Sequence, residues 1–168
     1  MKFSNIVLGE NVEIDPSTSI NNVLIKDNVR IAKRCSIFGG ADNLLEIHEG
    51  SYVGMNTIIN GFVEKVIIGS HVSIAQGVSI ICDSGPNAST ILQKVFPMEK
   101  GPIKIGNHCW IGAFCMIMPN VELGDFCVVA ANSFVKRSFP AYSIIGGTPA
   151  KLIRRMTGAE IEKLLSND

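Results

Sequence analysis

The sequence lacks an excess of charge of either sign. Its 15 lysines and arginines balance 15 aspartates and glutamates, so that the formal net charge at pH 7 is zero. Nucleic acids and anionic membranes attract proteins that carry a basic surface, and the composition indicates none. We therefore expect neither a nucleic-acid nor a membrane partner, and a small molecule becomes the default ligand.

Long apolar runs are also missing. Nowhere do about 18 apolar residues follow one another, as a membrane-spanning helix needs, and the first residues, MKFSNIVLGENVEID, have no sustained apolar segment typical of a signal peptide. We expect a cytoplasmic protein. With 168 residues, of which 46% are hydrophobic, the chain is long enough for one globular domain with its own core.

The five cysteines form no Cys-x-x-Cys pair and no zinc spacing with histidine. We therefore expect no metal.

The sequence does contain an aliphatic residue at every sixth position. This spacing is neither the period of two of an ordinary strand nor the 3.6 of a helix. The phase resets at four places, but the last block runs through six positions without a break. The residues are Leu8, Ile14 and Ile20; Ile25, Ile31 and Ile37; Ile47, Val53 and Ile59; Ile68, Ile74 and Ile80; and Ile105, Ile111, Ile117, Leu123, Val129 and Val135.

A second inward position and a turn recur at the same period. The residue two before each aliphatic is small or apolar, and glycine or alanine often follows the aliphatic, as at Gly54 and Gly112. Short strands separated by regular turns predict a solenoid in which each coil covers its neighbour, with three faces per coil. Four cysteines fall on the small inward position, where a thiol packs as a compact hydrophobe: Cys35, Cys109, Cys115 and Cys127. Cys82 is out of phase.

The pattern [LIV]-[GA]-x-x-[small]-x over residues 6–155 resembles the hexapeptide repeat of the left-handed parallel β-helix acyltransferases. The resemblance implies the left-handed coil, since the general rule for β crossovers favours the right hand. We expect an all-β solenoid domain over residues 1–155 with an inserted loop at 82–104. A short helix at 156–168 is predicted because Thr157 and Glu160 have the spacing of a capping box.

The segments WIGAFCMIMPNVELGDFCVVAANSFV and SIIGGTPAKLIRR resemble the acetyl-CoA half of the xenobiotic, galactoside, serine and polysaccharide O-acetyltransferases. This resemblance implies acetyl-CoA as co-substrate, bound between the subunits of a homotrimer. It gives roles to eight residues: Trp110 beside the reaction centre, Ala113, Ala130 and Ala131 along the pantetheine arm, Gly147 and Pro149 near the adenine, and Lys151 and Arg154 at the phosphates. Tight solenoid turns and an ordinary solvated face are the alternatives for these small and basic residues.

Ile80 and Ile105 are 25 positions apart, and the intervening loop is rich in glycine and proline. Loops of this length are usually functional or disordered. The apolar residues Ile91, Leu92, Val95, Phe96 and Met98 predict that the loop packs on another surface. Its short polar residues suit the hydroxyl groups of a sugar: Asp83, Ser84, Asn87, Ser89, Thr90 and Gln93.

The catalytic base is where this sequence departs from the family. The resemblance implies a histidine in the loop, but the loop has none, and Asn87 or a near neighbour takes its position. Asparagine cannot accept a proton in that role. Asp83 is a second candidate, although a carboxylate is a weak base unless it is buried, and Asp83 is equally suited to orienting a hydroxyl or capping the turn. Cys82, without a neighbouring histidine, is a poor nucleophile.

The third candidate base is His108, two residues before Trp110. His71 and His108 both occupy the third position after the aliphatic residue, which is a turn position, so a solvated or turn-capping role is the alternative. His48 lies on an outward face.

The sequence thus predicts an acyl-CoA-dependent O-acyltransferase that acts on a hydroxyl of a saccharide or similar polar acceptor. Two alternatives stay open. One is a hexapeptide-repeat protein that has kept the fold and CoA binding but lost efficient catalysis. The other is a gamma-type carbonic anhydrase, which would need three zinc-bound histidines.

Overall fold

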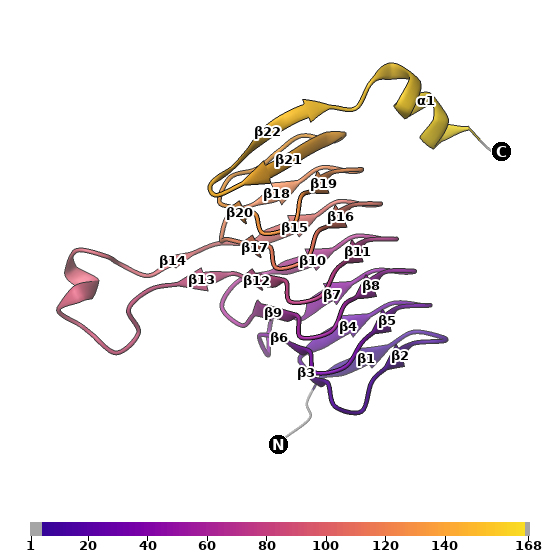
Figure 1. Cartoon of the computed structure of the whole chain (residues 1–168). Helices are drawn as coiled ribbons and strands as arrows, with labels where there is room; N and C mark the ends of the chain where they lie inside the picture. Colours follow the sequence, from indigo (N-terminus) through magenta and orange to yellow (C-terminus); the bar gives the residue numbers. More distant parts are fainter. Residues whose placement is uncertain (1–4, 167–168) are drawn as a thin grey trace.

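The computed structural model describes residues 5–166, which form a left-handed parallel β-helix with a side arm and a C-terminal helix (Figure 1). Three sheets make the faces of a prism. Sheet A contains β1 (Ile6–Leu8), β4 (Val23–Ile25), β7 (Leu45–Ile47), β10 (Val66–Ile68), β15 (Ile103–Ile105) and β18 (Glu122–Leu123). Sheet B contains β2 (Glu13–Ile14), β5 (Arg30–Ile31), β8 (Tyr52–Val53), β11 (Ser73–Ile74), β16 (Trp110–Ile111), β19 (Val128–Val129), β21 (Ser143–Gly147) and β22 (Ala150–Arg155). Sheet C contains β3 (Ser19–Asn21), β6 (Ser36–Gly39), β9 (Ile58–Gly61), β12 (Ser79–Ile81), β17 (Met116–Ile117) and β20 (Phe134–Val135).

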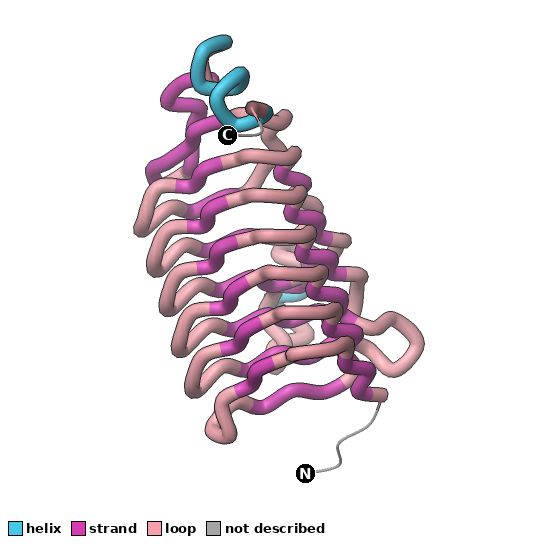
Figure 2. The backbone as a smooth tube through the Cα atoms, turned by 90° about the vertical axis from the view of Figure 1, so that its right-hand side faces the viewer, coloured by secondary structure: helices cyan, strands magenta, loops and turns pink. Residues whose placement is uncertain are grey.

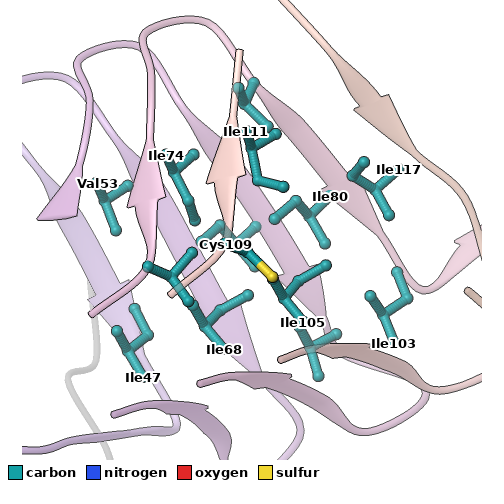
Figure 3. Close-up of a cluster of buried hydrophobic side chains, with 14 of the residues drawn as sticks. Ile47, Val53, Ile68, Ile74, Ile80, Ile103, Ile105, Cys109, Ile111 and Ile117 are labelled. Atoms are coloured by element: carbon teal, nitrogen blue, oxygen red, sulfur yellow. The ribbon is translucent and has the colours of Figure 1, made fainter. Parts of the chain in front are cut away.

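From Ile20 onward, the core consists of the aliphatic residues of the hexads, stacked coil upon coil. The predicted inward residues Leu8, which is 48% exposed, and Ile14, which is half-buried, lie on the edge strands β1 and β2 and are covered on one side only. In sheet A, Ile68 is in register with Ile47 on one side and Ile105 on the other, and all three are buried. The same stacking repeats in the other two sheets (Figure 3). The four cysteines on the small inward position are also buried, as the repeat predicts. Cys82, although out of phase, is buried too.

The three edges of the prism are rows of turns, visible as stacked loops in Figure 2. Most turns contain one residue in the left-handed backbone region, where asparagine and glycine are tolerated best. We call each row by the sheets it joins. The A–B edge has Asn11, Asn28, Gly50, His71, His108, Phe126 and Tyr142 at this position, and the B–C edge has Arg34, Asn56, Gly77, Phe114 and Asn132.

All four resets of the six-residue phase fall at the remaining edge, between sheets C and A. There the chain adds the turn at 39–44, closed by mutual backbone hydrogen bonds between Gly40 and Asn43, then the segment 61–65, and finally the long insertion. The core keeps its register because sheets A and C each resume pairing after every insertion. The C–A edge is therefore the place where this solenoid tolerates extra chain.

The loop predicted at 82–104 forms an arm over residues 83–100 that projects from the prism (Figure 1). At its ends, Cys82 is buried in the core, and Ile103 and Lys104 already belong to β15. The root of the arm is a two-stranded antiparallel ladder of β13 (Asp83–Ser84) and β14 (Glu99–Lys100), and a 3-10 turn, η1 (Leu92–Lys94), lies in its outer part. The expectation that its apolar residues pack on another surface is not met within the chain, since Ile91 is 76% and Val95 is 70% exposed. The apolar side chains of the arm are therefore exposed on its surface.

After β20, the chain ends in an antiparallel hairpin, which belongs to sheet B, and a helix. β21 and β22 pair through Gly147 and Ala150, with a cis peptide bond before Pro149. The helix α1 (Gly158–Leu165) begins at the predicted capping box of Thr157 and Glu160. The strand β22 was not expected from the sequence. Within residues 5–166, no helix has the length and apolar character needed to cross a membrane.

Replacement of one stacked aliphatic residue tests the core. Ile111 is fully buried between its partners Ile74 and Val129. We expect Ile111→Ala to lower the free energy of unfolding by about 2–5 kcal/mol, because the coils above and below prevent the cavity from closing. Leu165→Ala, at a side chain that is 61% exposed, is the control and is expected to change stability little. Chemical denaturation measures both, and equal effects would contradict the assignment of the core.

Candidate active site

The alanines predicted to line the pantetheine arm lie together on the B–C edge. Ala130 and Ala131 are exposed, and Ala113 is half-buried on the coil before them. The coils approach closely here: a Cβ on Gly112 would lie 2.6 Å from the amide nitrogen of Ala131. The edge therefore presents backbone with little side-chain bulk, as an extended amide-containing ligand requires.

The turn of the β21–β22 hairpin continues this row. The hydroxyl of Ser133 donates to the carbonyl of Ala130 at 2.6 Å and accepts from the amide of Gly147 at 3.1 Å. The Thr148 hydroxyl donates to the carbonyl of Asn132 at 3.3 Å. Gly147 and Pro149, predicted to lie near an adenine, are thus brought to the same edge as the alanines.

Trp110 points outward from β16 on the face of sheet B. Its strand lies between those of Ser73 and Val128, and 57% of the residue is exposed. Ala113, where the chain turns onto the B–C edge, follows three positions later. A large exposed indole beside a row of small residues provides a wall for a bound ligand.

The two predicted phosphate ligands differ in the structure. Lys151 is exposed at the start of β22. Arg154 instead forms a bidentate pair with Glu160, with both distances 2.8 Å. This pair holds the pKa of Glu160 down at about 2. Lys151 is therefore the better phosphate candidate, since Arg154 would first have to exchange its carboxylate partner.

Asp83 and Asn87 lie on the arm, at the C–A edge. Asp83 is half-buried at the root, where its Oδ1 accepts a hydrogen bond of 2.9 Å from Nδ2 of Asn60. Asn87 is exposed farther out. Burial raises the pKa of the neighbouring Cys82 thiol, which disfavours the thiolate that a nucleophile needs. Within one chain, the face of sheet C separates Asp83 from the alanines.

His108 lies on the third edge, between sheets A and B. Its ring stacks between those of His71 and Phe126, at centroid distances of 5.1 and 4.9 Å, and Phe126 stacks in turn on Tyr142. The structure therefore places His108 in an aromatic ladder of turn residues, away from both the arm and the alanines.

The three histidines also do not form a set of ligands for one metal ion. His48 pairs with Glu46 at 3.0 Å on the face of sheet A. Residues 5–166 contain no group of three or more His, Cys, Asp or Glu side chains arranged to hold a metal ion. The carbonic anhydrase alternative therefore lacks its ligand set.

Asn60, which contacts Asp83, is not among the site residues that the sequence predicts. It follows the core residue Ile59 at the end of β9, and its link to Asp83 spans 23 positions. The sequence gives no short-range signal for such a contact. The only indication is that an asparagine directly follows the last core residue before the C–A edge.

Residues 102–137 match the bacterial transferase hexapeptide family, described as six repeats. The dTDP-4-amino-4,6-dideoxy-D-glucose acyltransferase of Escherichia coli is 30% identical over 162 residues, covering 91% of this chain and 82% of that enzyme. The chain belongs to the hexapeptide-repeat acyltransferases.

Two other members extend the comparison. Galactoside O-acetyltransferase of Escherichia coli strain K12 is 34% identical over 113 residues, covering 67% of this chain and 54% of that enzyme. The match to the chloramphenicol acetyltransferase of Morganella morganii likewise spans only 58% of its length. Among solved structures, the N-acyltransferase AntD from Bacillus cereus, in complex with dTDP and 3-hydroxybutyryl-CoA, aligns with a TM-score of 0.80. It is 25% identical, and the alignment covers 93% of this chain and 86% of that one.

The ion pair at the end of β22 predicts a pH dependence. Because the folded pKa of Glu160 lies at about 2 and the ordinary value is 4.5, its contribution to stability is present above pH 4.5 and is lost as the pH falls toward 2. We expect the Glu160 carboxyl to titrate near pH 2 by carbon-13 NMR. In Arg154→Ala the midpoint should return toward 4.5. An unchanged midpoint would show that Arg154 is free to bind other anions.

Proposed function

We propose that this chain is an acyl-CoA-dependent acyltransferase that acylates an amino group of a sugar. The observation that carries the proposal is the row of small residues on the B–C edge, continued by the hairpin turn and ending at Lys151. Similarity extends over nine-tenths of the chain both to the acyltransferase of a dTDP-linked amino sugar and to AntD, an N-acyltransferase that was also crystallised with such a sugar. AntD was crystallised with an acyl-CoA, and this supports the same class of donor here.

The missing loop histidine favours an amine over a hydroxyl. A neutral amine has a free lone pair and loses its proton after attack on the thioester. A hydroxyl must lose its proton as it attacks, which calls for a base near pH 7. Asp83, a carboxylate, suits the first task better than the second.

A hydroxyl acceptor is the second candidate. The similarity to galactoside O-acetyltransferase supports it, as do the short polar side chains of the arm. The two chemistries are distinguished by incubating the protein with acetyl-CoA and paired sugars that differ only by amine or hydroxyl. Thiol release and product mass report transfer, and hydroxylamine cleaves the ester product but leaves the amide intact.

We further propose that the complete site forms between copies of the chain. Asp83 and the alanines occupy different edges of the prism, so that no single chain joins them. The arm carries exposed apolar residues, among them Phe96 at 63%, and the B–C edge carries Phe114 at 61%. Such surfaces usually mark an interface. A cyclic trimer would bring the arm of each subunit to the B–C edge of the next.

Replacement of Asp83 tests the base. We expect Asp83→Asn to lower kcat by about 10²–10⁴-fold, because the amide cannot accept the proton, while the Kd for CoA is unchanged. Asp42→Asn, at an exposed carboxyl of the 39–44 turn on the same edge, is the matched control and should retain full turnover. Equal activity of both variants would remove Asp83 from the mechanism.

Complementation between variants tests the shared site. Asp83→Asn removes the base, and Ala131→Trp fills the edge where the donor is proposed to lie. Each variant alone should be inactive. Unfolding and refolding the two together should restore about one quarter of wild-type activity, because a quarter of randomly formed interfaces pair an intact Asp83 with an intact Ala131. No recovery would mean that both residues act within one chain.

A further inference from the structure

We propose that Asn60 is a positioning residue for Asp83, holding one carboxylate oxygen so that the other is presented to the acceptor. This inference rests on the proposed function, because it assigns Asn60 a role in proton removal. It concerns a residue on the solenoid itself, whereas Asp83 belongs to the arm. The contact between them is therefore also the point at which the arm is oriented on the prism.

The orientation of the Asn60 side chain is determined by its two neighbours. The backbone N–H of Phe62 donates to Oδ1 of Asn60 at 2.9 Å, so that this end of the amide must be the oxygen. The NH₂ group then faces Asp83, and Nδ2 donates to Oδ1 of Asp83 at 2.9 Å. The Phe62 amide therefore fixes the orientation in which the Asn60 side chain donates to the carboxylate.

The backbone around the pair is fixed by short hydrogen bonds. The amide of Cys82 donates to the carbonyl of Asn60 at 3.0 Å, and the amide of Gly101 donates to the carbonyl of Cys82 at 2.9 Å. The Cys82 thiol lies 3.7 Å from Oδ1 of Asp83. Oδ1 therefore faces two protein donors, and Oδ2 is the oxygen left to accept a proton from an acceptor group.

The charged and titratable groups around Asp83 come from three elements. Cys82 precedes it in the chain, and Lys100 is its partner in the β13–β14 ladder. The adjacent 61–65 segment carries Glu64 and Lys65, but the Lys65 ammonium is paired with Glu46 on sheet A at 2.6 Å. The amide of Glu64 donates to the Cys82 sulfur at 3.4 Å, which ties that segment to the root of the arm. The neutral amide of Asn60 makes the shorter of the two side-chain hydrogen bonds to the carboxylate.

Two substitutions separate positioning from a merely structural role. Asn60→Asp keeps an oxygen for the Phe62 amide but cannot donate to Asp83, and it places a second carboxylate beside it. Asn60→Ala loses both bonds. If Asn60 served only to close its turn, Asn60→Asp would resemble the wild type and Asn60→Ala would be impaired.

If Asn60 positions Asp83, the two variants should differ from the wild type in another way. Both variants should lose kcat, by up to about 10²-fold, with little change in the KM for the acceptor. The acid limb of the kcat profile should move to higher pH in Asn60→Ala and farther in Asn60→Asp, because the charged carboxylate first loses a donor and then gains a like charge. Asn43→Ala, in the 39–44 turn of the C–A edge, where the backbone of Asn43 makes the hydrogen bonds to Gly40, is the control.

A readout without turnover keeps this proposal separate from the proposed function. Carbon-13 NMR of the Asp83 carboxyl, assigned by its loss in Asp83→Asn, should show the same order of titration midpoints in the free protein. An Asn60→Asp midpoint and pH profile equal to those of the wild type would overturn the proposal. If the wild type transferred no acyl group, the function would fail while the titration still decided the role of Asn60.

Discussion

The stacking of one aliphatic side chain upon the next is the interaction on which the rest of this structure depends. Each hexad forms one face of a coil and contributes one such residue to it, and the equivalent residues on the coils above and below complete its packing. Ile47, Ile68 and Ile105 show this in sheet A (Figure 3). Because the core is filled by repetition, chemistry is excluded from the interior and is confined to the faces and edges.

The stacking also aligns the turns into three rows with different uses. The A–B edge is a structural ladder, in which the rings of His71 and His108 stack. On the B–C edge, the small side chains of Ala113, Ala130 and Ala131 leave the backbone accessible. The C–A edge accepts insertions, because the parallel pairing of sheets A and C resumes after each of them. The proposed mechanism follows from this division, since the proposed donor edge and the proposed base lie on different rows and would come together only between two copies of the chain.

Much of the fold was predictable from the sequence because its determinants are local. The six-residue period locates the strands, the small inward position explains the four buried cysteines, and Thr157 with Glu160 marks the start of the helix. The row of small residues from Ala113 to Gly147 was also predictable. The left hand of the coil was not a matter of periodicity and came from resemblance to the family.

The rest depends on contacts between distant residues. The Arg154–Glu160 pair forms because β22 folds back on β21, and this strand was not anticipated. The exposure of Val95 and Phe96 reflects an arm that leaves its own solenoid, which composition alone cannot reveal. Asn60 meets Asp83 only because insertions stack at one edge. Asp83, Asn87 and His108 remain predicted site residues, and the structure separates His108 from the other two.

The proposed acyl-transfer site joins the B–C edge of one chain to the arm of another. Its most direct test is a crystal structure of the protein with CoA bound. We expect the pantetheine along Ala113, Ala130 and Ala131, with the thiol near Trp110 and facing Asp83 of a neighbouring copy. CoA bound elsewhere, or a thiol with no neighbouring arm beside it, would contradict the account.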